Sequence, residues 1–292
     1  MTREEGLVMK ILKKDFKNYL LLNELNKLSD IPKYIYIEGS FDILNMQSLA
    51  VIGSRRISTY GIKVIKELVP DVSRKNIVIV SGVAEGCDYL AQKTSIESGG
   101  TTIGILGGGL NLIKNHKYAK FMRQIIEDKK GAIISEFEPS EPPAKWTFIK
   151  RNRIIASLGQ KLLVIEAAQK SGTMHTVNFA LEMGKDILSV PGNIYNNNSE
   201  GTNKLIKDGA IVVTSSADIL GEYFEVNDYV PSINPEILKR HEKLLEFIRN
   251  EKTINEVSKE LNIPIGQLLS VLTTLEMQGI ISRIGDKWVR GR

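Results

Sequence analysis

Cysteine, histidine and long apolar runs are scarce in this sequence of 292 residues, and each scarcity excludes a class of protein. The single cysteine, Cys87, excludes an intrachain disulfide and a cysteine-based zinc site. The histidines His116, His175 and His241 form no metal-ligand spacing such as H-E-x-x-H. The longest apolar stretches are only strand-sized, and the first residues lack the apolar region of a signal peptide. We therefore expect a cytoplasmic protein with no membrane span and no bound metal.

The standard nucleotide-binding motifs are also missing. The spacing G-x-G-x-x-G begins at Gly107 and Gly109, but Leu112 stands at the third glycine position. No G-x-x-x-x-G-K-[ST] loop occurs, and no acidic residue follows a glycine loop in the ribose-binding pattern. The sequence therefore predicts no nucleotide cofactor.

The overall charge is mildly positive. The chain has 39 Lys and Arg against 34 Asp and Glu, which gives a net charge of +5 and a pI of about 9.0. An excess this small favours a polyanionic partner only slightly, so the positions of the cations matter more than their total.

From residue 33 onward, short β-branched runs alternate with segments of helical length. We expect strands at 34–37, 49–52, 77–80, 102–106, 132–134, 162–165, 187–190 and 210–213. We expect helices at about 60–75, 86–98, 115–130, 150–158, 173–184 and 200–208. Several of the strand runs are continuously apolar, as in parallel strands that helices cover on both faces. The pattern predicts an α/β fold with a doubly wound, mostly parallel sheet.

Changes in composition divide the chain into four segments. They are a short N-terminal helical extension (1–32), the sheet domain (33–220), a linker (221–235) and a small C-terminal domain (236–292). In the extension we expect Leu20–Leu22, Leu25 and Leu28 to be buried. The linker is acidic, contains two prolines and has no periodicity.

The C-terminal segment has the pattern of a winged helix. Helices are expected at 236–250, 253–261 and 264–278, followed by a hairpin that turns at Gly285-Asp286. The third of these helices carries no Lys or Arg, whereas a helix that reads the major groove usually brings cations for phosphates. We therefore favour a protein-interaction or auxiliary role for this domain, while four cations in the wing leave weak duplex contact open.

Glycine-containing loops follow four of the expected strands. They are Gly53-Ser54-Arg55-Arg56, Ser81-Gly82 to Gly86, Gly107-Gly108-Gly109, and Lys170-Ser171-Gly172-Thr173. In an open α/β sheet such loops meet at the carboxyl edge, where the N–H groups of the next helix can face a phosphate. One such loop more often only permits a tight turn. Four at one edge, one of them with adjacent arginines, favour an anion site.

The segment PPAKWTFIKRNR, residues 142–153, combines cations with aromatic rings and contains no acid. Its members of these two kinds are Lys145, Lys150, Arg151, Arg153, Trp146 and Phe148. Cations hold the phosphates of a single strand, and an aromatic face stacks an unpaired base. We interpret Trp146 as a core residue and Phe148, which lies between Lys145 and Arg151, as a site residue.

These loops, in this order, resemble the bacterial DNA-processing protein A family, also called Smf. The matching stretches are VIGSRR (51–56), IVIVSGVAEGCD (77–88), TIGILGGGL (102–110), ISEFEPSEPPAKWTFIKRNRIIA (134–156), LLVIEAAQKSGT (162–173), ALEMGKDILSVPGN (180–193) and GTNKLIKDGA (201–210). The resemblance implies an extended Rossmann-like fold that binds single-stranded DNA without a cofactor. It also implies a homodimer that acts in natural transformation, protecting incoming strands and loading a RecA-type recombinase onto them.

Carried over residue by residue, the resemblance implies a basic pocket. Its residues are Gly53, Ser54, Arg55, Arg56, Lys145, Phe148, Arg151, Asn152, Arg153, Ser171, Gly172 and Thr173, with Lys114, Lys117 and Gly108 as weaker candidates. The sequence departs from the family pattern at Glu85, Gln92, Lys114-Asn115 and Thr202. Glu85 stands where the family usually has a cation and removes a possible phosphate contact, which Lys114 and Lys117 would partly replace.

An enzyme is the alternative, a nucleotide phosphoribohydrolase of the lysine-decarboxylase-like Rossmann group. That group carries P-G-G-x-G-T-x-x-E, in which the glutamate assists cleavage at the ribose. The nearest match here is Lys170-Ser171-Gly172-Thr173, with Thr176 in place of the glutamate, so the general acid/base is missing. We interpret Glu136 and Glu166 as structural partners of nearby arginines.

Three further reactive side chains are left outside the expected site. Cys87 has no histidine near it in the sequence, and a free cysteine is usually a packing residue. His116 and His175 lie beside glycine loops, but a lone histidine is more often an ordinary hydrogen-bonded residue.

Overall fold

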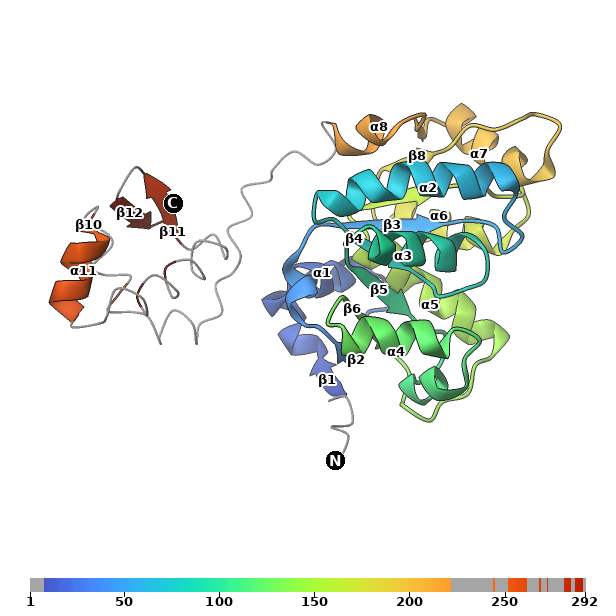
Figure 1. The fold of residues 1–292 in the computed structure, drawn as a ribbon. Coiled ribbons are helices and arrows are strands. Elements are labelled where there is room, and N and C mark those ends of the chain that lie inside the picture. Colours follow the sequence, from blue (N-terminus) through green and yellow to red (C-terminus); the bar gives the residue numbers. More distant parts are fainter. Residues whose placement is uncertain are drawn as a thin grey trace. The chain divides into compact units, whose positions relative to one another are not determined.

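A computed structural model describes residues 8–221, 252–261, 281–284 and 287–290, together with Leu244, Leu268 and Leu272 (Figure 1). The chain forms two compact units, Met1–Glu225 and Val226–Arg292. Within the described residues, no helix is long and apolar enough to cross a bilayer. The same residues contain no group of His, Cys, Asp or Glu arranged to hold a metal ion.

A sheet of nine strands forms the centre of the first unit, in the order β1-β2-β6-β5-β4-β3-β7-β8-β9 (Figure 1). The strands are β1 (Met9–Leu12), β2 (Tyr34–Gly39), β3 (Ser48–Ile52), β4 (Val78–Ser81), β5 (Thr102–Ile105), β6 (Gly131–Ser135), β7 (Lys161–Val164), β8 (Ile187–Ser189) and β9 (Ile211–Val212). From β6 to β9 all neighbours in this order pair in parallel, while β2 joins β6 and β1 joins β2 antiparallel. The doubly wound, mostly parallel sheet is thus confirmed.

Helices cover both faces of this sheet. One face carries α2 (Thr59–Arg74), α3 (Cys87–Glu97), α4 (Ala119–Glu127) and α8 (Ser216–Leu220). The other carries α1 (Leu20–Asn23), α5 (Lys145–Leu158), α6 (Gly172–Glu182) and α7 (Asn197–Lys207). The 3-10 segments are η1 (Lys13–Asn18), η2 (Glu24–Lys27), η3 (Asp42–Asn45) and η4 (Leu110–Asn115).

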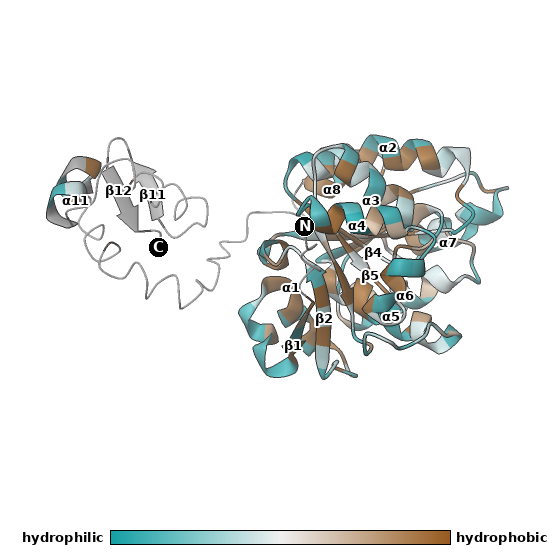
Figure 2. Cartoon of the chain, turned by 60° about the horizontal axis from the view of Figure 1, so that its bottom comes forward, coloured by the Kyte–Doolittle hydropathy of each residue, from teal (hydrophilic) through white to brown (hydrophobic). Residues whose placement is uncertain are grey.

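Strand β3 shows why the strand sequences are so apolar. All five of its residues are buried. Ala50 and Ile52 pack with the N-terminal segment, α5 and α6, whereas Leu49 and Val51 pack with α2 and α3 on the opposite face. Figure 2 shows strands of the central sheet as largely hydrophobic ribbons, and the helices around them with both hydrophobic and hydrophilic residues. A strand covered on both faces has no solvent side, so its sequence does not alternate.

The N-terminal extension differs from the prediction. Residues 9–12 form an edge strand that pairs with β2 in the register Met9↔Ile37, and 3-10 turns follow it with only one short α-helix, α1. The extension expected to be helical over 1–32 is thus only partly helical among the described residues. The four residues of β1, MKIL, lie among lysines and carry too short a pattern to show a strand. Burial is confirmed for Leu21, Leu22, Leu25 and Leu28, while Leu20 is half-buried.

Two helices of the sheet domain also differ from their expected bounds. Helix α5 begins at Lys145, five residues before the expected start, because the Thr147 hydroxyl accepts a hydrogen bond from the Ala144 N–H and closes the first turn there (2.9 Å). The helix expected at 115–130 is shorter in the structure, where α4 covers only Ala119–Glu127 and η4 ends before it at Asn115.

The second unit contains a small sheet in the order β10-β12-β11. Its elements are β10 (Lys252–Thr253), α11 (Ile254–Leu261), β11 (Ile281–Ile284) and β12 (Lys287–Arg290). Strands β11 and β12 pair antiparallel, as the expected hairpin requires, and α11 matches the expected helix at 253–261. The turn at Gly285-Asp286 lies outside the described residues, as do the linker beyond Gly221 and most of 236–250 and 264–278. The winged-helix assignment stays a prediction.

Candidate nucleic-acid interface

A groove of about 720 Å³ opens at the carboxyl edge of the sheet, between the ends of β3 and β7. From β3 the chain continues to β4, β5 and β6 on one side, and then crosses back to β7, β8 and β9 on the other. Crevices form where the strand order reverses in this way, because the loops after the two central strands diverge. The groove therefore lies where this topology favours a ligand.

The groove collects nearly all of the residues expected in the site. Its lining contains Gly53, Ser54, Arg55, Arg56, Lys145, Phe148, Arg151, Asn152, Ser171, Gly172 and Thr173. The lining also includes residues that the sequence reading did not single out for the site, namely Ile52, Ala84, Asp88, Ile149, Ile155, Ala168, His175, Thr176 and Asn198.

Close backbone packing fixes the loop that carries Arg55 and Arg56. A Cβ on Gly53 would lie 2.5 Å from the Cys87 Sγ, so only glycine fits this position. The Cys87 N–H donates to the Ser54 carbonyl (3.1 Å), and the Thr173 hydroxyl donates to the Gly53 carbonyl (3.2 Å). The start of α3 and the start of α6 thus hold the loop from two sides.

Glu166 holds the other end of the same loop. Its buried carboxylate accepts hydrogen bonds from the Ser58 N–H (2.9 Å) and from the Ser58 hydroxyl. Ser58 is the N-cap of α2, and its hydroxyl oxygen accepts from the Gly61 N–H (3.2 Å). The prediction that Glu166 pairs with an arginine is wrong. Both of its carboxylate oxygens instead accept hydrogen bonds from Ser58.

The accessible charge of the groove is positive. Arg55, Arg56 and Lys145 are exposed, and none forms an ion pair with another residue in the part of the chain described here. Lys145 stands in the first turn of α5, where a cation opposes the helix dipole, so stability does not explain it. The Asp88 carboxylate in the lining is buried and accepts from the Gly82 N–H (3.2 Å). Burial raises the pKa of Asp88 to about 6, although the nearby Arg151 opposes that rise.

Arg151 braces the groove from below. Its buried guanidinium donates to the carbonyls of Gly82 (2.5 Å) and Ile105 (2.6 Å), which follow β4 and end β5. Burial lowers the pKa of Arg151 to about 10, and the Asp88 carboxylate opposes this, so the group stays protonated at neutral pH. The Arg151 side chain thus joins two strand ends, while the exposed cations Arg55, Arg56 and Lys145 remain accessible to a ligand.

Phe148 forms the wall between the groove and a second cavity. Its ring is 38% exposed and lies against Gly107, where a Cβ would come within 2.5 Å of the ring Cδ1. The guanidinium carbons of Arg55 and Arg151 each lie 6.0 Å from the ring centroid. The Thr147 hydroxyl donates to the Gly107 carbonyl (2.6 Å), which fixes the start of α5 and hence the ring.

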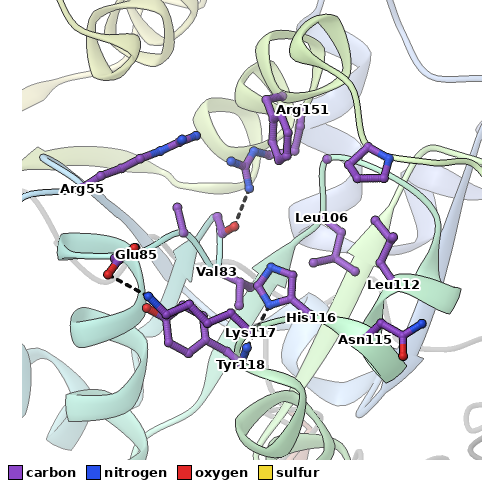
Figure 3. Close-up of a pocket in the computed structure, with 15 residues that line it drawn as sticks. Arg55, Val83, Glu85, Leu106, Leu112, Asn115, His116, Lys117, Tyr118 and Arg151 are labelled. Carbon is purple, nitrogen blue, oxygen red and sulfur yellow. Dashed lines mark hydrogen bonds and ion pairs between the residues drawn. The ribbon is translucent and has the colours of Figure 1, made fainter.

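A second cavity, of about 400 Å³, also has Phe148 in its lining. Figure 3 shows this cavity with Arg55, Arg151 and Tyr118 around it. Arg55 and Arg151 border it, and its wall includes Tyr118, which stacks on Tyr89 with 3.8 Å between the ring centroids. Its mouth carries the Glu85–Lys117 ion pair (2.7 Å). Lys117 lowers the pKa of Glu85 and Glu85 raises the pKa of Lys117. Lys117 is thus paired with the acid that it was expected to offset, and its expected role in replacing the lost phosphate contact stays a prediction.

Several expected residues lie elsewhere. Arg153 is buried and pairs with Glu136, as expected for that carboxylate, but it does not line the groove. Lys114 and Gly108 line neither cavity. Trp146 is 55% exposed, so its assignment to the core is wrong; its ring makes a T-shaped contact with Phe137 at 5.7 Å between the ring centroids.

Both histidines set aside from the site do line cavities. His175 lies in the groove and His116 in the second cavity, where burial lowers the pKa of His116. The buried Cys87 has its pKa raised mainly by desolvation, which suits a packing residue. The position of each histidine beside a glycine loop was visible in the sequence, but the direction of its side chain was not.

Known proteins share this fold and these loops. A protein Smf from Escherichia coli is 33% identical over 92% of this chain and 74% of its own length. A DNA processing protein DprA from Streptococcus pneumoniae is 36% identical over 68% of this chain and 70% of its own. A crystal structure of DprA from that species has a TM-score of 0.65 at 33% identity, covering 75% of each chain.

A DNA processing protein A from Helicobacter pylori, studied for its single-stranded DNA binding mode, has a TM-score of 0.62 at 29% identity, over 68% of this chain and 89% of that one. The sequence model of the DNA recombination-mediator protein A family matches residues 10–224, which include every residue of the groove. This chain therefore belongs to the DNA recombination-mediator protein A family.

Proposed function

We propose that the groove binds single-stranded DNA and that the protein acts on the strand without catalysis. The observation that carries this proposal is that Arg55, Arg56 and Lys145, which have no ion-pair partner among the described residues, line the same groove as the exposed ring of Phe148. The cations would neutralise successive phosphates, and the ring would stack one unpaired base. A base inside a duplex has no free face, so this arrangement favours a single strand.

The start of α6 supplies a further phosphate contact. The first N–H groups of any α-helix lack partners within the helix. Here the N-cap Ser171 makes no side-chain hydrogen bond to them, and its buried Oγ has no hydrogen-bond partner in the part of the chain that the structure describes. Gly172 and Thr173 open into the groove, so a phosphate oxygen would satisfy donors that the protein leaves free.

The relatives support this assignment. The Helicobacter pylori protein is described as binding single-stranded DNA, and the family is named for mediating recombination. We infer that this chain protects incoming single strands during natural transformation and delivers them to a RecA-type recombinase in the cytoplasm. A recombinase-loading assay tests the second step: the wild-type protein should speed filament formation on strands coated with a single-strand binding protein, and Arg55→Ala should not.

The phosphoribohydrolase alternative finds less support in the groove. Thr176 lines the groove at the position that would need a general acid/base, and it is buried. The carboxylate in the described lining is Asp88, which is buried and held by the Gly82 N–H. Incubation with nucleoside monophosphates should therefore release no free base.

A homodimer is part of the proposal. Strand β9 lies at the edge of the sheet, where its unpaired backbone groups can meet a second chain. Its Val212 is 43% exposed, and Leu181 on α6 is 55% exposed. Sedimentation should show a dimer for the wild type and a monomer for Val212→Lys; a wild-type monomer would contradict this part.

Fluorescence anisotropy with labelled oligo-dT and a matched duplex tests the binding proposal. The wild type should bind the single strand more tightly, and Phe148→Ala should remove most of that preference. Trp146→Ala is the matched control, because this exposed ring lies on the same helix but outside both cavities. Equal binding of both nucleic acids by the wild type, or equal effects of the two variants, would contradict the proposal.

A further inference from the structure

The loop between β8 and α7 exposes two large apolar side chains. Among the described large hydrophobic residues, Ile194 and Tyr195 are the most exposed, at 77% and 90%. Burying such side chains against a partner is favourable, and a fully exposed tyrosine ring offers both of its faces.

The loop is nevertheless held in place. The Asn203 side chain bonds both backbone groups of Gly192, donating to its carbonyl (2.9 Å) and accepting from its N–H (3.1 Å). The Tyr60 hydroxyl donates to the Pro191 carbonyl (2.7 Å), and the Asn193 side chain accepts from the Tyr195 N–H (2.9 Å). The exposed pair is thus presented on an ordered loop, which lowers the entropic cost of binding.

The loop adjoins the groove. It follows β8, the parallel neighbour of β7, and therefore leaves the sheet at the same edge as the groove. Asn198, three residues beyond Tyr195, lines the groove and donates to the Arg56 carbonyl (2.9 Å). Arg56 also lines the groove, so this hydrogen bond joins the groove to the start of α7.

The surroundings suit a polyanion. Residues 190–199, VPGNIYNNNS, contain no acid and four asparagines, whose amides can donate to phosphate. Arg56 and, one turn into α2, Lys63 are exposed and form no ion pair among the described residues. Cations beside an exposed aromatic ring are the elements of a single-strand binding surface.

We propose that a single strand of DNA leaving the groove at Arg56 continues over this loop and stacks an unpaired base on Tyr195, with Ile194 packed beside it. This inference rests on the proposed binding of single-stranded DNA in the groove. It makes the binding surface longer than the groove itself, and it assigns the loop 190–196 as a second contact along the same strand.

A length series of labelled oligo-dT, from about 4 to about 16 nucleotides, tests the proposal by anisotropy. Tyr195→Ala should leave the affinity for the shortest strands unchanged and should weaken binding of the longest about fivefold or more. Tyr195→Phe keeps the ring and should bind like the wild type at every length. Leu12→Ala, an exposed apolar side chain on β1 at the opposite edge of the sheet, is the matched surface control.

The outcomes separate this inference from the proposed function. If Arg55→Ala weakens binding at every length while Tyr195→Ala binds all lengths like the wild type, the groove stands and the extended surface is overturned. If Tyr195→Ala instead changes the sedimentation of the free protein, the loop is a protein contact and the extended surface is again overturned. If the wild type does not bind, or Arg55→Ala has no effect, the proposed function fails first.

Photocrosslinking gives a readout that does not depend on affinity. Strands carrying 5-iododeoxyuridine at one position each should give an adduct on Phe148 from one position and on Tyr195 from another. Adducts confined to Phe148 across all positions of a long strand would overturn the extended surface.

Discussion

Replacing Arg151 by methionine distinguishes two roles of this residue, stabilising the groove and contacting DNA directly. The guanidinium donates two hydrogen bonds to the carbonyls of Gly82 and Ile105 and lies in the field of Asp88. Each charge-assisted hydrogen bond contributes about 1.5–3 kcal/mol, so losing both costs about 3 kcal/mol or more. For a domain of this size, that loss lowers Tm by about 6–12 °C.

The same replacement should make stability depend on pH. The folded pKa of Asp88 is already raised to about 6, and without Arg151 it rises further because the opposing cation is gone. A carboxyl with a raised folded pKa stabilises the fold at low pH and loses that contribution as pH rises through the folded value. Arg151→Met should therefore be destabilised less at about pH 5 than at about pH 8.

Thermal unfolding of the sheet domain, followed alongside oligo-dT binding, measures both effects. Lys145→Met is the matched control: it also removes one cation of the groove, but from an exposed position, so Tm should stay near the wild type while affinity falls. If Arg151→Met unfolds like the wild type and loses DNA binding, Arg151 is a phosphate contact and the bracing role is refuted.

Three other predictions concern the residues that shape the groove and the core. Glu166→Ala should leave the Ser58 N–H unpaired and lower the free energy of unfolding in urea by about 1–3 kcal/mol. Binding of oligo-dT should also weaken because the loop that carries Arg55 loosens, and unchanged stability would refute that role. Gly107→Ala should displace the Phe148 ring and weaken single-strand binding without changing its salt dependence, and a flatter salt dependence would show that the cations had moved instead. Burial lowers the pKa of Lys185 to about 8. Between about pH 8 and pH 10.5 the folded chain has lost this proton while the unfolded chain still binds it. The free energy of unfolding should therefore rise by up to about 3 kcal/mol over that range. Lys185→Met should lose this rise, and a variant that keeps it would assign the rise to another group.

The sequence predicted the sheet and the groove because both depend on local signals. Strands buried on both faces must be continuously apolar, as in SLAVI of β3, and tight loops at their ends need glycine, as at Gly53 beside Cys87. Parallel strands bring those loops to one edge whatever the details of packing. The four loops could therefore be grouped from their positions alone, whereas the resemblance to the family placed Lys145 and Phe148 in one pocket with them.

Two of the wrong predictions depend on contacts between distant parts of the chain, and a third depends on where one helix begins. Glu166 bonds Ser58 across 108 positions, and no local pattern links the two. Trp146 was assigned to the core because large aromatic residues usually bury, but helix α5 starts earlier than expected and turns this ring outward. Strand β1 forms by antiparallel pairing with β2, which lies more than 20 residues away in the sequence.

The salt dependence of single-strand binding tests the central claim most directly. For the wild type, the logarithm of the oligo-dT association constant should fall linearly with the logarithm of salt concentration, by about 0.7 per phosphate neutralised. Arg55→Ala should flatten that slope, whereas Phe148→Ala should lower the affinity and leave the slope unchanged, because stacking releases no counterions. A wild type that does not bind at low salt, or an Arg55→Ala variant with the wild-type slope, would contradict single-strand binding in this groove.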